Sequence, residues 1–245
     1  MDTANKNYSA NKSINKVKDI ILEEVSEDAK HLHKLSLSYS NDKTQIYNKW
    51  ADNYDDYVKN EQYMGPKNLV ECLRKYLGNL TDDLTGNTAI LDFGCGTGLV
   101  GSEIARQFSD IKYSIIGVDM SPGMINQSRK LNIYDNLVCA DIVDKNKSLT
   151  NIRELVGDQF NLIVSCGVFL EGHVSLESIP RVFLHLLHKR GGVLAVTIRD
   201  SFLKRSPNFI SDLKELKVLG FDILELSEIE YLKGVKAWLL VVKRG

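Results

Sequence analysis

The 245-residue sequence lacks the features that mark several large classes of protein. No apolar run approaches the roughly 20 residues that span a bilayer. The N-terminus is polar, and Asp2 interrupts any basic presequence, so no signal or transit peptide is visible. The cysteines show no CxxC spacing and have no histidine clustered beside them, which argues against a zinc site or a disulfide framework. They are Cys72, Cys95, Cys139 and Cys166. We therefore expect a cytoplasmic protein with no metal site and no membrane contact.

The sequence also has no excess of basic charge. Its 31 Lys and Arg residues balance 32 Asp and Glu residues, for a net charge of −1. The pairs Lys189-Arg190 and Lys204-Arg205 are too short for a nucleic-acid footprint, so we expect no nucleic-acid partner. The apolar share of 43% and the charged share of 26% are typical of a globular protein. The chain is long enough for one large domain or two small ones.

The first third of the chain is helical in pattern. After a polar tail, apolar residues recur at spacings of three and four from Ile14 to Leu35, which predicts an amphipathic helix that docks as a lid or on a neighbouring chain. We assign residues 1–43 to this tail and helix. A capping box at Asp42 opens a second helix that carries several aromatic residues, which would usually be core. They are Tyr47, Trp50, Tyr54 and Tyr57. Pro66 starts a third helix that ends at Gly78.

From residue 88 the pattern changes to alternating strands and helices. This alternation predicts an α/β fold with a parallel sheet that is covered on both faces and a terminal hairpin, so that one of seven strands is antiparallel. The predicted strands are Thr88–Asp92, Tyr113–Asp119, Leu137–Asp141, Phe160–Ser165, Val193–Ile198, Phe221–Tyr231 and Ala237–Lys243. Three of them end in an acid, which places Asp92, Asp119 and Asp141 at the edge where such sheets bind ligands.

The segment 90–101 reads ILDFGCGTGLVG, an apolar strand that passes through alternating glycines into a helix. Glycine has no Cβ, so the backbone can approach a ligand, and the helix start adds unpaired N–H donors. One interpretation takes Gly96, Gly98 and Gly101 as a dinucleotide fingerprint, with Asp119 as the ribose acid. This interpretation predicts an NAD-dependent oxidoreductase.

The other interpretation starts from the strand end at Asp92 and takes Gly94, Gly96 and Gly98 as the functional glycines. It is favoured because the dinucleotide fingerprint needs its first glycine directly after the strand. Gly101 then lies inside the helix and serves helix packing.

On this motif, the chain from residue 44 onward resembles the class I S-adenosylmethionine-dependent methyltransferases. The segment 115–122, IIGVDMSP, is similar to the family's second motif, and the segment 139–142, CADI, is similar to the part that borders adenine. The resemblance implies a Rossmann-like core over 88–245 and a helical lid over 44–87. It implies cofactor contacts at Asp92, Gly94, Gly96, Gly98, Asp119, Met120, Asp141 and Ile142. In this family the acid equivalent to Asp119 holds both ribose hydroxyls.

Two further segments sharpen the resemblance. The segment 47–55, YNKWADNYD, is similar to a signature that precedes many small-molecule methyltransferase domains, which implies that Tyr47 and Tyr54 contact the methionine end of the cofactor. The segment 165–174, SCGVFLEGHV, resembles the Williams–Beuren region methyltransferase-like protein family, and Cys166 in it borders the cofactor. The sequence departs from that family at residues 188–192, HKRGG, where a proline more often precedes the glycines.

Methyl transfer from a sulfonium needs alignment and a dry pocket, and it needs a general base only when the acceptor is protonated. His173 follows the fourth strand and is the candidate base, although a loop histidine can equally hold backbone groups. Glu171 is a weaker candidate. We expect a small-molecule acceptor, and the sequence gives no oligomeric state. A cofactor-binding module without catalysis is the remaining alternative.

Overall fold

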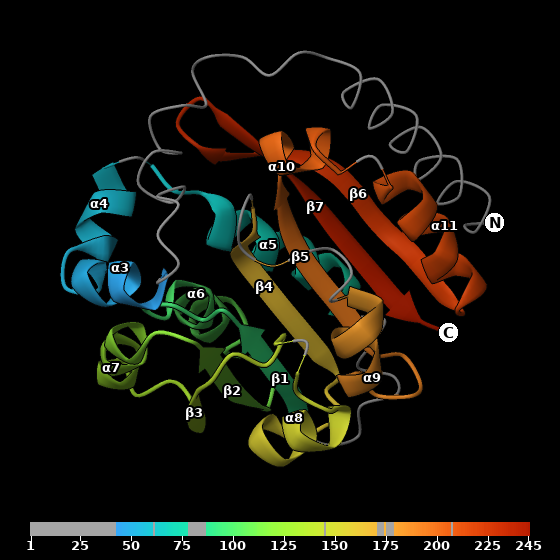
Figure 1. Cartoon of the computed structure of the whole chain (residues 1–245), viewed down its shortest axis with the longest axis horizontal. Coiled ribbons are helices and arrows are strands. Elements are labelled where there is room, and N and C mark those ends of the chain that lie inside the picture. Colours follow the sequence, from blue (N-terminus) through green and yellow to red (C-terminus); the bar gives the residue numbers. More distant parts are fainter. Residues whose placement is uncertain are drawn as a thin grey trace.

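The computed structural model describes residues 43–60, 62–77, 87–144, 146–170, 174, 179–206 and 208–245. Their strands form one seven-stranded sheet in the order β3-β2-β1-β4-β5-β7-β6 (Figure 1). Strand β7 is antiparallel to β5 and β6, and the other neighbours are parallel, which confirms the expected Rossmann-like sheet. The strands are β1 (Thr88–Phe93), β2 (Tyr113–Asp119), β3 (Asn136–Cys139), β4 (Leu162–Phe169), β5 (Val193–Arg199), β6 (Phe221–Leu232) and β7 (Val235–Arg244).

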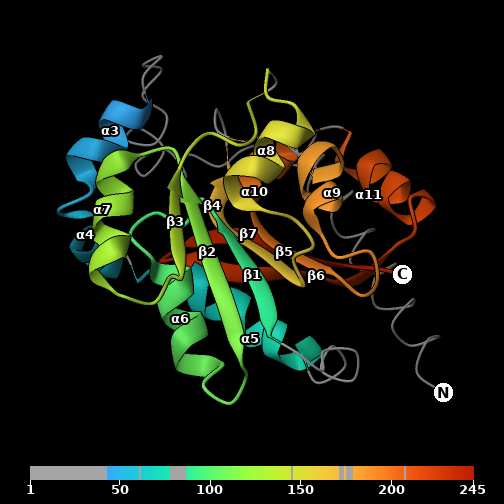
Figure 2. The same cartoon turned by 90° about the horizontal axis from the view of Figure 1, so that it is seen from below.

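Helices cover both faces of this sheet, as Figure 2 shows from below. Helices α5 and α6 pack on one face, and α8 to α11 pack on the other, each over its own apolar core. Among the described residues the helices are α3 (Lys43–Trp50), α4 (Tyr54–Asn60), α5 (Gly65–Leu77), α6 (Leu99–Gln107), α7 (Pro122–Lys130), α8 (Leu149–Val156), α9 (Leu184–Leu186), α10 (Asp200–Lys204) and α11 (Phe209–Val218). Because helices bury both faces of the sheet, its strands are apolar along most of their length.

Most predicted boundaries lie within a few residues of the observed ones, and three differences stand out. Strand β4 runs on to Phe169, and β3 stops at Cys139, so Asp141 lies two residues beyond its strand. Helix α10 was not expected, because its five residues are too short to give a periodic pattern. After β4 the chain also forms a π-helical segment, Ile179–Phe183, which is followed by α9.

The helix predicted after Asp42 is two helices, so that prediction was wrong. The segment 51–53 forms a turn between α3 and α4. It contains Asp52 and Asn53, whose short polar side chains compete with helical hydrogen bonds and favour turns. The predicted helix over 14–35, its neighbour Asp42 and the stop at Gly78 lie outside the described residues, and the division into lid and core stays a prediction.

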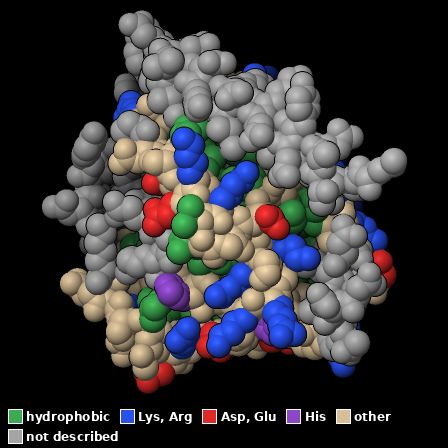
Figure 3. Space-filling model, turned by 90° about the vertical axis from the view of Figure 1, so that its right-hand side faces the viewer, with side chains coloured by type: hydrophobic (Ala, Val, Ile, Leu, Met, Phe, Trp, Pro, Cys, Tyr) green, Lys and Arg blue, Asp and Glu red, His purple; other side chains and the backbone are tan. Residues whose placement is uncertain are grey.

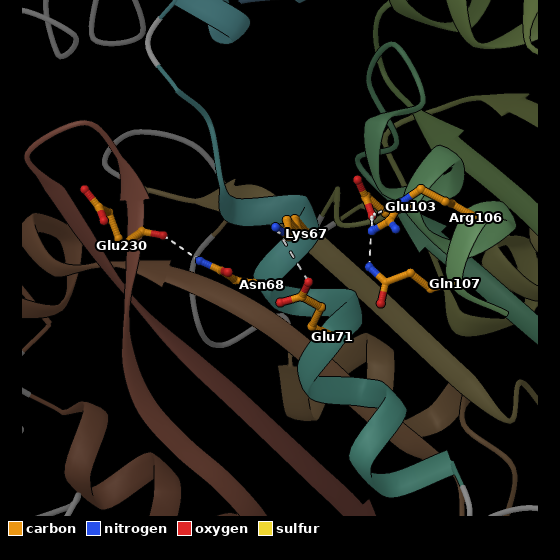
Figure 4. A network of polar contacts seen from close by, with 7 residues as sticks. All are labelled: Lys67, Asn68, Glu71, Glu103, Arg106, Gln107 and Glu230. Carbon is orange, nitrogen blue, oxygen red and sulfur yellow. Dashed lines mark hydrogen bonds and ion pairs between the residues drawn. The ribbon is translucent and has the colours of Figure 1, made fainter.

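Helix α5 crosses the sheet beside the terminal hairpin, and Figure 4 shows the polar contacts along it. Asn68 donates a hydrogen bond of 2.8 Å to the backbone carbonyl of Glu230 in β6. Lys67 and Glu71 form an exposed ion pair at 3.8 Å, which contributes at most about 1 kcal/mol. The main contribution comes from Leu69 and Leu73, which are fully buried against the sheet. Helix α5 therefore packs across β4, β5 and β6 and connects the terminal hairpin to the parallel part of the sheet.

Candidate functional site

A cavity of about 320 Å³ opens at the carboxyl ends of β1, β2 and β4. This volume lies at the lower end of the range typical of small-molecule sites, and the position is the one that doubly wound sheets use for ligands. Helices α3 and α4 close the cavity from above. Its lining consists of Tyr47, Tyr54, Phe93, Gly94, Gly96, Val118, Asp119, Met120, Met124, Ala140, Asp141, Val143, Cys166, Gly167, Val168 and Val174.

The glycine turn between β1 and α6 forms the floor of the cavity. Gly94, Gly96 and Gly98 have φ angles of +68°, +54° and +99°, which side chains with a Cβ rarely adopt. A Cβ on Gly94 would overlap the side chain of Val168, whereas a Cβ on Gly96 would meet no atom within 4 Å. The turn thus needs glycine for its conformation, and at Gly96 it is open to a ligand.

Asp119 at the end of β2 ties the turn to the next helix. One carboxylate oxygen accepts a hydrogen bond from the Gly96 N–H at 3.0 Å, and the other accepts one from the Ser121 N–H at 2.8 Å. Each oxygen keeps a second lone pair, so the carboxylate can still accept one bond at each oxygen, as a vicinal diol would require. Burial raises the pKa of Asp119, and the backbone donors of Ser121 and Gly96 oppose this rise.

Asp141 lies in the loop after β3 and borders the other end of the cavity. Its Oδ1 accepts hydrogen bonds from the backbone N–H groups of Val143 at 3.0 Å and Asp144 at 3.1 Å. Both bonds fall on one oxygen, which leaves Oδ2 for a donor in the ligand. Met120 also lines the cavity, and its side chain is 41% exposed.

Three predicted contact residues do not line the cavity. Asp92 is fully buried behind the turn and accepts a hydrogen bond of 2.7 Å from the Tyr134 hydroxyl. Gly98 begins α6 on the far side of the turn, and Ile142 is fully buried in the core. They shape the turn and the loop after β3, and their contact with the cofactor stays a prediction.

The helices above the cavity divide their residues between two tasks. Tyr47 and Tyr54 line the cavity, and their predicted contact with the methionine end of the cofactor stays a prediction. Asn48 Oδ1 accepts hydrogen bonds of 2.8 Å from the Ser121 hydroxyl and from the Gly123 N–H. These bonds fix α3 to the start of α7. The sequence interpretation missed this second task because it weighed only the aromatic residues.

Helix α4 is fixed in the same way. Asp55 accepts a hydrogen bond of 2.5 Å from the Thr97 hydroxyl in the glycine turn, and Asp52 accepts one of 2.6 Å from Gln127 in α7. The acids of the signature therefore attach the helices to the core, while the tyrosines face the cavity.

The wall at the end of β4 is formed by Cys166, Gly167 and Val168. Burial raises the pKa of the Cys166 thiol to about 12, so the group is a neutral thiol at neutral pH. The Cys166 sulfur lies 3.2 Å from the Tyr63 hydroxyl, which lies 2.9 Å from the Tyr231 hydroxyl. Glu171 and His173 lie outside the described residues, so the predicted base stays a prediction.

The comparisons with known proteins agree with this geometry. Residues 90–192 match the family model described as "Methyltransferase domain". The human "Methyltransferase-like protein 27" is 28% identical over 197 residues, which cover 80% of this chain and 70% of that protein. The chain is a class I S-adenosylmethionine-dependent methyltransferase.

One further relative and one solved structure are similar to this methyltransferase. "Malonyl-[acyl-carrier protein] O-methyltransferase 1" of Ilyobacter polytropus is 26% identical, with 81% of this chain and 75% of that protein covered. The plantazolicin methyltransferase BpumL, solved in complex with a monoazolic desmethylPZN analog and SAH, superposes with a TM-score of 0.55 at 14% identity. That superposition covers 95% of this chain and 99% of the other.

The residues that line the cavity of this methyltransferase fit S-adenosylmethionine. The open Gly96 and the remaining acceptor capacity of Asp119 suit a ligand with a ribose diol beside the turn. The NAD interpretation is not supported, because β1 ends at Phe93 and the glycine that directly follows it is Gly94, whereas the dinucleotide fingerprint would have to start at Gly96. The interpretation that starts from the end of the strand, with Gly94, Gly96 and Gly98 as the glycines of the turn, is therefore preferred.

Several residues that line the cavity of the methyltransferase were not predicted from the sequence as site residues. Phe93, Val118 and Ala140 directly precede or follow a motif residue, so their place could have been inferred from strand ends. Met124 reaches the cavity from the first turn of α7, whose N-cap is Ser121.

Two absences concern the described part of the methyltransferase. There, no three His, Cys, Asp or Glu residues gather in a way that could hold a metal ion. None of the helices described is both long enough and apolar enough to cross a membrane.

Proposed function

We propose that this methyltransferase acts on a small-molecule acceptor that binds at the β4 end of the cavity. The observation that carries the proposal is the attachment of α3 and α4 over the cavity, through Asn48 and Asp55. A cavity of about 320 Å³ with two helices fixed above it suits a small acceptor better than a folded macromolecule.

The cofactor supplies a methyl group that is already activated on a sulfonium. The protein's own part is to bind, orient and exclude water. Asp119 and the glycine turn orient the ribose side, and Tyr47 and Tyr54 cover the site. We keep His173 as the proposed base for a protonated acceptor.

Charge on the surface favours the same kind of acceptor. Lys and Arg side chains are interspersed with Asp and Glu side chains on the face that Figure 3 shows, with no continuous basic stripe in its described part. Such a surface suits a small molecule better than a nucleic acid. The chain's cysteines are all unpaired, which favours a reducing compartment, and we propose the cytoplasm.

The proposal is tested by calorimetric titration with S-adenosylmethionine and with NADH, followed by metabolite fractions in an assay for released S-adenosylhomocysteine. We expect binding of S-adenosylmethionine and release with at least one small-molecule fraction. Tight NADH binding without S-adenosylmethionine binding would refute the methyltransferase assignment. Cofactor binding without release from any fraction would favour a module that acts through a partner.

A further inference from the structure

Arg199, the last residue of β5, is a buried cation with too few partners. Its side chain is only 6% exposed, and Nε has no hydrogen-bond partner in the part of the chain that the structure describes. The adjacent carboxylate of Asp200 is used elsewhere: it pairs with Lys204 at 3.2 Å and accepts a bond from Trp238 at 3.3 Å. A guanidinium stays charged at every relevant pH, and a buried charge without an anion is costly. Such a group is suited to a ligand that brings the anion.

The position of Arg199 connects it to the cavity. Residues two apart on a strand face the same side, so Arg199 shares a side with Thr197. The Thr197 hydroxyl lies 3.5 Å from the Cys166 sulfur and accepts a bond of 3.1 Å from the Gly167 N–H. Cys166 and Gly167 line the cavity. Arg199 therefore stands beside the cavity wall at the end of β4.

An aromatic ring lies beside the guanidinium. Its central carbon is 5.8 Å from the ring centroid of Tyr231, a cation–π contact that holds the group without neutralising it. Its charge also acts on Tyr47, which lines the cavity: burial and Asp119 raise the pKa of Tyr47, and Arg199 opposes them. The positive charge of Arg199 thus acts on a residue that lines the cavity.

The order of strands separates this cation from the acids of the cofactor site. Asp119 ends β2 and Asp141 follows β3, whereas Arg199 ends β5. Between β2 and β5 lie β1 and β4, so with strands about 4.8 Å apart the two ends are separated by roughly 14 Å. The glycine turn lies between them. The ribose end is acidic, and the opposite end is cationic.

We propose that Arg199 binds an anionic group of the methyl acceptor, so that the acceptor is a small organic anion with a carboxylate or phosphate. This inference rests on the proposed function. An arginine binds either group through two parallel hydrogen bonds, which would orient the acceptor as well as hold it. The methionine carboxylate of the cofactor is the other possible anion. The acceptor is favoured because Arg199 lies two strands away from the glycine turn on β1.

The test uses the full chain saturated with S-adenosylhomocysteine and two fluorine-labelled probes of the same shape, 4-fluorobenzoate and neutral 4-fluorobenzamide. Fluorine NMR reports the affinity of each probe, and calorimetry reports that of S-adenosylhomocysteine. The variants are Arg199→Met and Arg199→Lys, and Arg190→Met in the exposed turn before β5 is the control. We expect the wild type and R190M to bind the benzoate in preference to the benzamide. R199M should weaken the benzoate roughly 10- to 100-fold and leave the benzamide unchanged.

The other variant and the cofactor measurements give further outcomes that support or refute the proposal. R199K should keep part of the preference for the benzoate because it keeps the charge, and it serves in place of R199M if the methionine variant does not fold. If R199M weakens S-adenosylhomocysteine tenfold or more, Arg199 holds the cofactor and the proposal is wrong. Equal binding of the two probes by the wild type also overturns it. Failure of the wild type to bind S-adenosylhomocysteine at all would instead refute the proposed function.

Discussion

Replacing Asp92 by Asn should remove a pH dependence that is built into the centre of the fold. Asp92 is fully buried, and burial raises its pKa from 3.8 to about 7, although the Tyr134 hydroxyl opposes the rise. A folded-state pKa above the unfolded one means that the native state binds the proton more tightly. The stability from this proton is present below pH 3.8 and is lost as the pH rises to about 7. A rise of about 3 pKa units corresponds to roughly 4 kcal/mol.

The assay is urea unfolding, followed by tryptophan fluorescence, of the wild type and of Asp92→Asn between pH 4 and pH 8. The free energy of unfolding of the wild type, relative to the variant, should fall by roughly 4 kcal/mol across this range. Taking the difference cancels the other titrating groups. A difference that stays constant with pH would refute the buried, protonated carboxyl.

A matched variant tests the cause of the effect. Tyr134→Phe removes the hydroxyl that lowers the pKa of Asp92. The fall in stability should then continue to higher pH than in the wild type. An unchanged upper limit would mean that the hydrogen bond does not act on this carboxyl.

Three further predictions concern the cofactor and the base. Asp119→Ala should weaken S-adenosylmethionine by about 1.5–3 kcal/mol in calorimetry. The exposed Asp158→Ala serves as its control, and an unchanged affinity would remove the ribose assignment. Gly96→Ala and Gly157→Ala both force an alanine to positive φ with no atom within 4 Å of the Cβ. Gly157→Ala should lose at least as much thermal stability, because its φ of 81° and ψ of −169° lie in a region that is almost restricted to glycine. Only Gly96→Ala should lose cofactor affinity, and equal affinities would contradict an open turn at Gly96. His173→Ala should lower turnover and spare cofactor affinity, and normal turnover would exclude His173 as the base.

The parts of this structure that the sequence predicted are those with a local cause. Strand β2 has the predicted bounds, Tyr113–Asp119, and the helix predicted to start at Pro66 begins one residue earlier, at Gly65. Apolar runs, strand-end acids and capping residues act within a few positions of one another, so a single sequence contains them. The choice of Gly94 as the first glycine of the turn also depends only on neighbouring residues.

The parts that escaped prediction depend on distant residues. The break between α3 and α4 could have been suspected from Asp52 and Asn53, but the spacing of the aromatics outweighed them. The burial of Asp92 depends on Tyr134, which lies 42 positions further along the chain. No local pattern distinguishes an acid that faces a ligand from one that lies behind the turn, because both end the same kind of strand.

The signature over 47–55 shows how one segment can carry both a binding and a structural role. Its tyrosines line the cavity, whereas Asn48 and Asp55 bind the start of α7 and the glycine turn. Those partners are themselves part of the cofactor site, since Asp119 binds both the turn and Ser121. The helices above the cavity and the turn below it therefore share hydrogen bonds around one carboxylate. A change at Asn48 should for this reason weaken the cofactor without touching it, and a change at Asp119 should loosen the helices that cover the cavity.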